Sequence, residues 1–323
     1  MIYVITLFLG IHSLLAYPSL LSQKLQKVGI DAPSPRNGHR MIYDEARRVT
    51  LLFGGIDGNK KSLGDTWAWN GSAWKRINSL GPSPRSWHSL AYDSHRKIVV
   101  LFGGRDSSGK SLGDTWEWDG TRWRLAANGQ PSARDHQAMT YDRVRNRVVL
   151  HGGFNGSQVF GDTLEWDGKI WTRMAETGPP ARATHHIAFD LASGRTLLYG
   201  GIEPPNRVFS DTWAWDGKQW VKLHDGNNDG RTHSAMIYEL WCRCIMRFGG
   251  KDSNRKPFGD HWRFNNGRWI RLEGDGPPAR IDHSLSMDSH RKKAVLFGGK
   301  TPDPESVVYG DTWEWDGRIW RQR

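Results

Sequence analysis

Short apolar runs that end in two glycines recur along the chain. VTLLFGG at 49–55 and IVVLFGG at 98–104 are examples, and a run such as HRMIYD at 39–44 comes before each of them. An aromatic segment such as DTWEW at 114–118 comes after. Apolar runs of this length, bounded by turn residues, predict β-strands. No stretch has the period of a helix of useful length, so we expect an all-β protein.

The same pattern returns six times with a nearly constant period. Successive glycine pairs lie 48 or 49 residues apart, and two further series of residues keep step with them. The glycine pairs end at Gly55, Gly104, Gly153, Gly201, Gly250 and Gly299. The second series is Asp65, Asp114, Asp162, Asp211, Asp260 and Asp311, and the third is Arg36, Arg85, Arg134, Arg182, Arg231 and Arg280. One unit is therefore repeated six times, from about residue 34 to the end.

Each unit is predicted to be a meander of four antiparallel strands. Asp119 and Gly120 form a favourable turn between a third strand and a fourth that opens at Trp123. Six such sheets arranged radially would bury their faces against one another. We expect Trp116 and Trp118, on one side of their strand, to fill the wedge between neighbouring sheets.

The recurring glycines, aspartates and tryptophans are therefore assigned to the fold. Paired glycines permit backbone torsions and close approaches that other residues resist. They include Gly54 and Gly55 in the first unit, and Gly103 and Gly104 in the second.

The predicted division of the chain follows from the repeat. Residues 1–17 form an apolar N-terminal segment, residues 18–33 a linker, and residues 34–323 six blades. The blades are expected at about 34–80, 82–129, 131–177, 179–226, 227–275 and 277–323. Because residues 25–36 align with 74–85, Leu25–Val28 is predicted to be a strand at the outer edge of the last blade, closing the ring.

This pattern resembles the kelch repeat, whose period is about 50 residues. The likeness rests on the Arg-led first strand, the second strand ending in Gly-Gly and the aromatics at set distances. It implies a six-bladed kelch β-propeller with four antiparallel strands per blade, similar to the central domain of galactose oxidase. The recurring DTWxWDGxxW motif resembles that of kelch-type proteins of bacteria.

The repeated arginines have two interpretations. Because an active site is normally asymmetric, residues that recur in every unit favour a structural role, here a bidentate Arg–Asp pair within the blade. The alternative is a ring of arginines that forms an anion site over the central channel. In that interpretation Arg85, Arg134 and Arg231 contribute to ligand binding.

The first-strand histidines fall into two groups. His39, His88, His185 and His283 share the parity of bulky apolar residues and are predicted to pack between blades. His136, His186 and His233 have the opposite parity and occur only in units three to five.

One position in the unit varies while its surroundings repeat. Two residues after each repeat arginine stand Gly38, Trp87, His136, Thr184, His233 and Asp282. Because the innermost strand begins there, we expect these side chains to meet near one mouth of the channel. Trp87, His136, His233 and Asp282, joined by His186, suit a polar, ring-shaped ligand such as a sugar. A metal held by the three histidines is less favoured, and relaxed packing at a loop would also explain the diversity.

The predicted function is a non-enzymatic binding or interaction module for a glycan or protein partner. Its ligand is expected on the face that carries the variable loops 56–63, 105–112, 154–160, 202–209, 251–258 and 300–309. The alternative is a sugar-active enzyme, resembling a mutarotase of sialic acid, with a basic central pocket. No phosphate loop, zinc pattern or nucleophile elbow occurs, and the copper site of galactose oxidase has no counterpart, so no cofactor or catalytic residue is assigned.

Charge and cysteine content change this picture little. The formal charge of +11 is spread through all six units, which indicates a basic surface rather than a nucleic-acid site.

Cys242 and Cys244 are the only two cysteines. Two residues apart on a predicted strand, they would point to one face and bridge poorly. The protein is expected to be a monomer.

The N-terminal segment indicates export. Residues 2–17 are uncharged and mostly apolar, a length that suits a signal peptide better than a membrane span. No basic residue precedes them, which is unusual for such a signal. We expect a secreted or cell-envelope protein that contacts a membrane only through residues 2–17 if they are uncleaved. The protein would be cytoplasmic if this segment is not an export signal.

Overall fold

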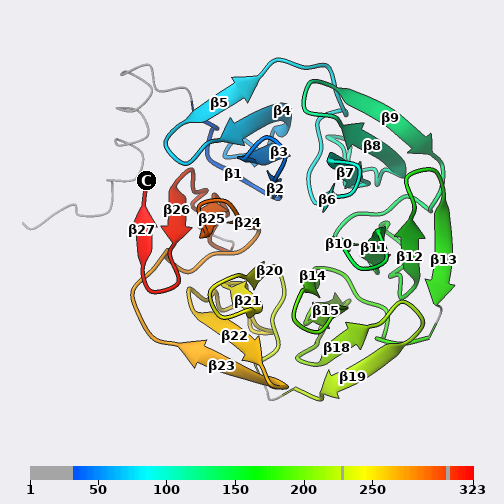
Figure 1. Cartoon of the computed structure of the whole chain (residues 1–323), viewed down its shortest axis with the longest axis vertical. Helices are drawn as coiled ribbons and strands as arrows, with labels where there is room; N and C mark the ends of the chain where they lie inside the picture. Colours follow the sequence, from blue (N-terminus) through cyan, green and yellow to red (C-terminus); the bar gives the residue numbers. More distant parts are fainter. Residues whose placement is uncertain (1–31, 176, 227–228, 303–305) are drawn as a thin grey trace, which may run out of the picture.

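Six sheets of antiparallel strands surround a central axis (Figure 1). The computed structural model describes residues 32–323, apart from residue 176, residues 227–228 and residues 303–305. Every regular element in that part of the chain is a β-strand, which confirms the all-β prediction. Residues 2–17 and the predicted closing strand Leu25–Val28 lie outside the described residues. The described ranges contain no helix long and apolar enough to cross a membrane.

Each blade contains four strands that pair in chain order from the axis outward. The innermost strands are β2 (Arg40–Asp44), β6 (Ser89–Asp93), β10 (Ala138–Asp142), β14 (His186–Asp190), β20 (Ala235–Glu239) and β24 (Ser284–Asp288). The second strands are β3 (Val49–Asp57), β7 (Ile98–Phe102), β11 (Arg147–His151), β15 (Arg195–Tyr199), β21 (Cys244–Phe248) and β25 (Lys293–Phe297). The third strands are β4 (Ser62–Trp69), β8 (Asp114–Trp118), β12 (Thr163–Trp166), β18 (Thr212–Trp215), β22 (His261–Asn265) and β26 (Thr312–Trp315). The outermost strands are β5 (Trp74–Ile77), β9 (Trp123–Asn128), β13 (Trp171–Ala175), β19 (Trp220–His224), β23 (Arg268–Leu272) and β27 (Trp320–Gln322).

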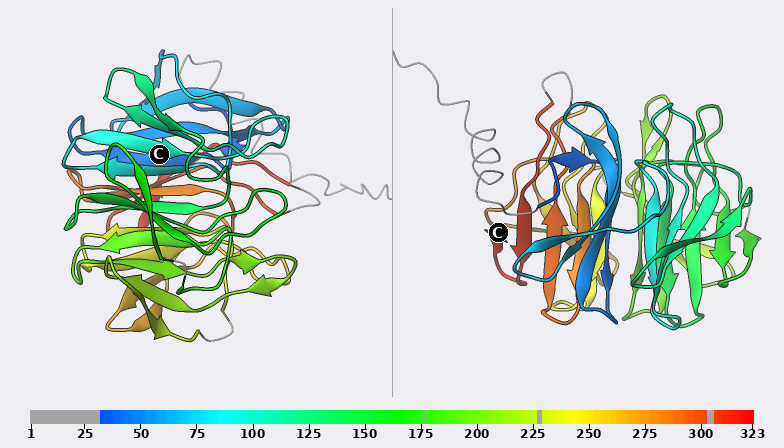
Figure 2. Two further views of the ribbon diagram at one scale, coloured as in Figure 1. Left: turned by 90° about the vertical axis from the view of Figure 1, so that its right-hand side faces the viewer. Right: turned by 90° about the horizontal axis from the view of Figure 1, so that it is seen from above.

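Two short pairings extend this frame. β1 (Arg36–Asn37) pairs with the end of β3, and β16 (Ile202–Glu203) pairs with β17 (Arg207–Val208) in the loop of blade 4. Both lie where second strands run into third strands. We call this side of the ring the loop face and the opposite side the turn face. The turn face carries the hairpin turns between innermost and second strands, at residues 45–48, 94–97, 143–146, 191–194, 240–243 and 289–292; Figure 2 shows the ring edge-on.

Tryptophan pairs fill the space between blades. In five blades the last residue of the third strand packs on the first residue of the outermost strand, as Trp118 does on Trp123 with ring centroids 5.6 Å apart. In blade 5 the pair is Phe264 and Trp269. Trp118 is buried in a cluster that contains Leu51 and Phe53 of blade 1 and Leu101 of its own blade. The concentration of tryptophan in the sequence is thus a packing device of the ring.

Most outermost tryptophans also donate a hydrogen bond to the preceding blade. Trp123 donates from Nε1 to Oγ1 of Thr66 at 3.1 Å, and Trp220 donates to Thr163 at 2.7 Å. In blade 5, His261 occupies the position that threonine has in the other blades. The buried Nε1 of Trp320 consequently has no hydrogen-bond partner among the described residues.

The ring closes where blade 1 meets blade 6. The backbone N–H of Arg36 donates to the carbonyl of Tyr309 at 3.0 Å, and that of Met41 donates to Oγ of Ser284 at 2.8 Å. On the outside, Trp74 donates from Nε1 to Oγ1 of Thr312 at 2.9 Å. Side-chain and loop contacts of the kind that join other blades therefore hold the first and last described blades together.

Candidate functional site

A closed ring of backbone hydrogen bonds surrounds the channel on the loop face. It joins the six residues of the variable position, Gly38, Trp87, His136, Thr184, His233 and Asp282. Each N–H donates to the carbonyl of its counterpart in the preceding blade at 2.8–3.2 Å, and Gly38 donates to Asp282 to complete the circuit. The predicted convergence of these positions is confirmed.

All six ring residues have a left-handed backbone, with φ between 53° and 64°. This torsion turns the chain sharply into the innermost strand and points one N–H and one carbonyl along the circumference. Only Gly38 adopts it without steric cost. The other five hold a strained conformation that the neighbouring blades enforce.

The side chains of the ring pack on one another. The rings of Trp87 and His136 are stacked with centroids 4.7 Å apart, and His233 meets His136 edge-on at 6.0 Å. Asp282 is buried beside them. Burial lowers the pKa of His233 to about 3, so this imidazole is neutral at pH 7. The loop-face end of the channel is thus filled by protein side chains, and their role in ligand binding stays a prediction.

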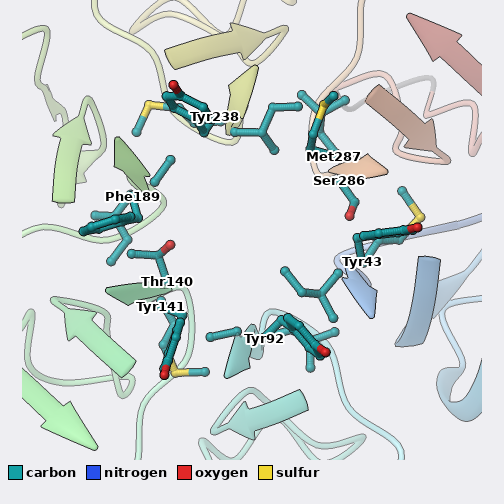
Figure 3. Close-up of a pocket in the computed structure, with 18 of the residues that line it drawn as sticks. Tyr43, Tyr92, Thr140, Tyr141, Phe189, Tyr238, Ser286 and Met287 are labelled. Carbon is teal, nitrogen blue, oxygen red and sulfur yellow. The ribbon is translucent and has the colours of Figure 1, made fainter. Parts of the chain in front are cut away.

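A cavity of about 280 Å³ occupies the channel beyond these packed side chains. It is lined by the innermost strands, and no ring residue contributes to its wall. Figure 3 shows Thr140 and Ser286 pointing into the opening, with Tyr43, Tyr92 and Tyr238 around its edge.

The cavity reaches the turn face rather than the loop face. Its wall includes Glu45, Arg143, Leu191, Leu240 and Ser289, all from hairpin turns of that face. Arg143 and Glu45 form an ion pair between the turns of blades 3 and 1. A ligand of the cavity would therefore enter opposite to the variable loops.

Two basic side chains lie at the inner end of the cavity. His186, on β14, lines it, and burial lowers the pKa of His186 well below its ordinary value. Its Nε2 has no hydrogen-bond partner among the described residues. Arg40, on β2, donates from Nη1 to the carbonyl of His39 at 3.0 Å and has no ion-pair partner in the described part of the chain. Burial lowers the pKa of Arg40 and the nearby carboxylate of Asp282 opposes that shift, so the guanidinium stays charged.

Arg40 is the functional candidate that the sequence analysis missed. The predicted variable position lies two residues after each repeat arginine, whereas Arg40 lies four residues after Arg36. The signal was present, because the equivalent residues of the other units are Ser89, Ala138, His186, Ala235 and Ser284. Only blade 1 places a long cation there.

The repeat arginines belong to the fold. Arg85 donates to both oxygens of Asp114, at 2.6 and 2.8 Å, and its remaining N–H groups bond to Ser83 and to the carbonyl of Gly103. Trp116 donates from Nε1 to the same carboxylate at 2.7 Å. Burial alone raises the pKa of Asp114, but the bonds and charge of Arg85 outweigh it and hold that pKa below its ordinary value.

The same pair forms in every blade and is loosest in blade 5. The six contacts are Arg36–Asp65, Arg85–Asp114, Arg134–Asp162, Arg182–Asp211, Arg280–Asp311 at 2.6–2.7 Å, and Arg231–Asp260 at 3.5 Å. The arginines are almost completely buried, so an arginine ring over the channel is wrong. Arg85 and Arg134 donate hydrogen bonds to Asp114 and Asp162. The guanidinium carbon of Arg231 lies 3.5 Å from the ring centroid of Phe258.

The interblade histidines are where the sequence predicts them. His39, His88, His185 and His283 are buried, and His88 meets Phe53 of the preceding blade edge-on at 5.4 Å. The other three do not form a metal site. In the described part of the chain, the group whose ligand atoms lie close enough is Glu239, Cys242 and Cys244.

The expectation for the cysteines is wrong. Cys242 and Cys244 form a disulfide, with Cα atoms 5.2 Å apart. They do not share a strand, because Cys242 lies in a hairpin turn and β21 begins at Cys244. Arg243 between them has a left-handed backbone with φ of 53°, which turns the two side chains toward each other.

Comparison with known proteins agrees with the repeat. Residues 70–225 match the model of the KLHDC2/KLHL20/DRC7 Kelch-repeats domain. No curated protein matches the chain. The narrower likenesses, to bacterial-type kelch proteins and to galactose oxidase, stay predictions. The match over residues 70–225, together with the six blades of the structure, supports a kelch-repeat fold built as a six-bladed β-propeller.

Proposed function

We propose that this propeller is a binding module whose channel takes a small acidic, hydroxylated ligand of the sugar-acid class. A kelch propeller fits a binding or interaction module in general. The observation that carries the narrower proposal is Arg40. Three charged side chains other than histidine line the cavity. Glu45 and Arg143 pair with each other, and Arg40 forms no ion pair with a carboxylate of the described residues, although the carboxylate of Asp282 is near enough to act on its charge.

Arg40 would bind the acidic group of the ligand. A guanidinium presents its donors in a planar fork that matches a carboxylate. One of its nitrogens already donates to the carbonyl of His39, which fixes the side chain at the inner end of the cavity. An anion that reaches it leaves water and gains a charge-assisted bond in partly enclosed surroundings.

The rest of the wall suits a compact ring with hydroxyl groups. Ser286 Oγ and His186 Nε2 are buried polar atoms without a partner among the described residues, and Thr140 points into the opening. Ile42 and Ile237 supply apolar contacts on the same strands. A few convergent polar groups on a mostly apolar wall are typical of small-molecule sites, and the volume is that of a small ligand.

The competing expectations lose part of their basis. The sugar-active enzyme rested on a basic pocket made by the repeat arginines, and these are buried in ion pairs with aspartates. The remaining cation, Arg40, favours recognition of one acidic group. A protein partner on the loop face is a separate possibility. Its binding would not depend on Arg40, so the Arg40→Gln variant would still bind it.

The test is calorimetric titration of the purified chain with sugar acids and with their neutral methyl esters. The acids should bind and the esters should bind at least tenfold more weakly, since loss of a charge-assisted bond costs about 1.5–3 kcal/mol. Arg40→Gln should remove the preference. Arg76→Gln, on the exposed outer strand β5, is the matched control and should keep it. Binding of no sugar acid, or equal binding by the Arg40 variant, would contradict the proposal.

A further inference from the structure

We propose that Cys242 and Cys244 are a redox-active pair that exchanges with thiols of the glutathione type and locks the turn at residues 240–243 when oxidised. The proposal does not depend on the function of the channel. The two cysteines are the only ones in the chain, so neither has an alternative partner within the molecule.

The pair occupies a position that other blades give to an ion pair. In blade 6, Arg291 of the turn donates from Nε to Asp288 at 2.6 Å and from Nη1 to Glu314 at 2.5 Å. In blade 5 the turn residue equivalent to Arg291 is Cys242, and the third strand supplies the cation instead, through Arg263. The blade therefore keeps its charge balance without the turn arginine.

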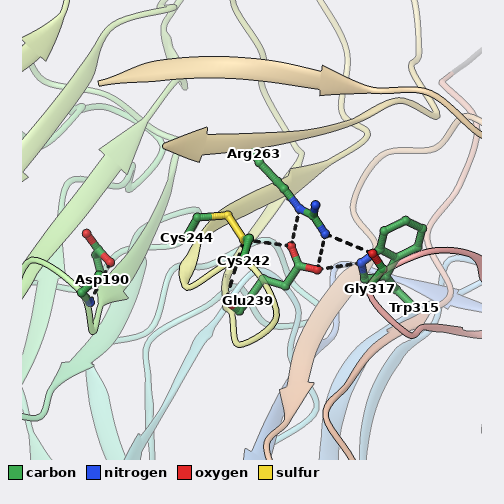
Figure 4. Close-up of a disulfide and its surroundings, with 8 residues drawn as sticks. Asp190, Glu239, Cys242, Cys244, Arg263, Trp315 and Gly317 are labelled. Carbon is green, nitrogen blue, oxygen red and sulfur yellow. Dashed lines mark hydrogen bonds and ion pairs between the residues drawn. A yellow bond between two sulfur atoms is a disulfide. The ribbon is translucent and has the colours of Figure 1, made fainter. Parts of the chain in front are cut away.

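The contacts of Glu239 show how Arg263 replaces the turn arginine. Arg263 donates to both oxygens of Glu239 at 2.7 Å, and Trp315 donates from Nε1 to Oε1 at 2.8 Å (Figure 4). Cys242 Sγ lies 3.2 Å from Oε2 of the same carboxylate. Glu239 is completely buried and its oxygens are engaged, so it is poorly placed to serve as a metal ligand beside the sulfurs. Thiol–disulfide exchange suits this site better than metal binding.

The disulfide replaces the hydrogen bonds that close the other turns. Asp93 accepts from the backbone N–H groups of His95 and Arg96, and Asp288 accepts from that of Arg291. Among the described residues, no N–H group of the 240–243 turn donates to Glu239, because Arg263 and Trp315 hold that side chain. Beyond the pairing of β20 with β21, the Cys242–Cys244 bond thus takes the place of the side-chain bonds that close the other turns.

Access to the two sulfurs is unequal. Cys242 is partly exposed and lies between the exposed residues Trp241 and Arg243, whereas Cys244 is buried. A thiolate would therefore attack the Cys242 sulfur, and Cys244 would leave as a thiolate that takes a proton. A second thiol then attacks the outer sulfur of the mixed disulfide. The products are two protein thiols and one oxidised glutathione, so two electrons pass to the protein.

A bridge between residues this close in sequence contributes little to global stability. Its loop is too short to restrict the unfolded chain much, and chain restriction is the main source of disulfide stabilisation in the loop-entropy model. Reduction should therefore leave the propeller folded and release only the turn. That turn carries Leu240, in the wall of the cavity, and Trp241, which donates from Nε1 to the carbonyl of Lys292 at 2.9 Å.

The test combines thiol labelling with limited proteolysis in glutathione buffers that range from fully oxidised to fully reduced. Mass spectrometry after alkylation should show both thiols appearing together and disappearing on reoxidation. Trypsin should cut after Arg243 at least tenfold faster in the reduced protein, because cleavage needs an extended backbone that the bridge prevents. Lys97 and Lys292, exposed at the same position of other turns and also left-handed, are internal controls whose cleavage should not change.

A matched variant uses residues that other blades carry at these positions. Ser193 is the equivalent of Cys242 in blade 4, and Val49 is the equivalent of Cys244 in blade 1. The double variant Cys242→Ser with Cys244→Val should be cut after Arg243 at the reduced rate in every buffer. The proposal is overturned if the thiol content is the same across the whole glutathione range, if Cys242 forms only intermolecular disulfides, or if cleavage after Arg243 is independent of the redox state.

Discussion

Trp87 and His136 are joined twice across the boundary between blades 2 and 3. The backbone N–H of His136 donates to the carbonyl of Trp87 at 3.0 Å, and the two aromatic rings stack at 4.7 Å with an interplanar angle of 21°. The backbone bond repeats around the ring, whereas the stacking occurs only here. The repeat therefore builds the aperture of the channel, and the variable side chains determine how far it is filled.

Thr184 is the ring residue that this geometry suits least. It holds φ at 56° although its side chain is β-branched, and its buried Oγ1 has no partner among the described residues. A left-handed backbone costs a non-glycine residue about 1–3 kcal/mol, and the unfolded-state entropy of glycine offsets about 1 kcal/mol of that. Thr184→Gly should therefore raise the free energy of unfolding by about 1 kcal/mol in urea titrations.

The control for this prediction is Thr172→Gly, on the exposed outer strand β13. It should lower stability by about 1 kcal/mol, since glycine weakens a regular strand. Equal losses in both variants would show that the left-handed backbone at Thr184 is not strained.

Blade 5 departs from the repeat at His261 and leaves the buried Nε1 of Trp320 without an acceptor among the described residues. In blade 2 the equivalent residue, Thr115, accepts from Trp171 at 2.9 Å. An unsatisfied buried donor costs about 1–3 kcal/mol, part of which is recovered if the acceptor is restored. His261→Thr should raise the midpoint of thermal unfolding, and Thr115→Val should lower it. A lower midpoint for the His261 variant would mean that the packing of the imidazole on Trp315, at 4.5 Å, matters more.

The fold was predictable because six copies of one unit carry the same sequence pattern, and each copy therefore predicts the same four strands. The parity of His39 against His136, and the constant offset between Arg36 and Asp65, separate packing residues from channel residues without any three-dimensional information. Symmetry also favours a structural role for the arginines over the alternative anion site, since a residue needed in every blade is seldom reserved for one ligand.

The site was less predictable because it depends on what six strands bring together. The sequence indicates that Trp87 and His136 meet at the axis, but not that they stack and fill that end. Arg40 matters only because its five counterparts are smaller and leave a cavity. The expectation for the cysteines fails for a local reason. The strand begins at Cys244 and not at Cys242, and the left-handed backbone of Arg243 before it has no signal in the apolar pattern.

The Arg–Asp pairs should differ in strength between blades. Arg85 meets Asp114 at 2.6 Å with all of its donors used, whereas Arg231 meets Asp260 at 3.5 Å and its buried Nε has no partner among the described residues. Breaking a buried pair leaves an uncompensated charge and costs about 3–5 kcal/mol. Arg85→Met should lower the free energy of unfolding by that amount, and Arg231→Met by less than half of it. Equal losses in urea titrations of the two variants would show that the looser geometry has no energetic consequence.

The buried histidines should make the propeller sensitive to acid. Burial, and then the charges of Arg40 and Arg85, lower the pKa of His88 well below its ordinary value, so the folded state keeps this imidazole neutral. The unfolded chain binds a proton there below about pH 6.5. The contribution of His88 is therefore complete above pH 6.5 and is lost as the pH falls, by about 1.4 kcal/mol for each pH unit.

Blade 3 supplies the substitution that tests this expectation. Gln137 stands where the other blades have histidine or serine, and it donates from Nε2 to the carbonyl of Phe102 at 2.9 Å. His88→Gln should fold at pH 7.5 with a stability close to that of the original chain. Between pH 6.5 and pH 5 it should lose about 2 kcal/mol less than the original chain, measured by urea unfolding at each pH. His95→Gln, in the exposed turn that follows β6, is the control and should leave the pH profile unchanged. Parallel profiles for the original chain and the His88 variant would mean that His88 is not the group whose protonation destabilises the blade.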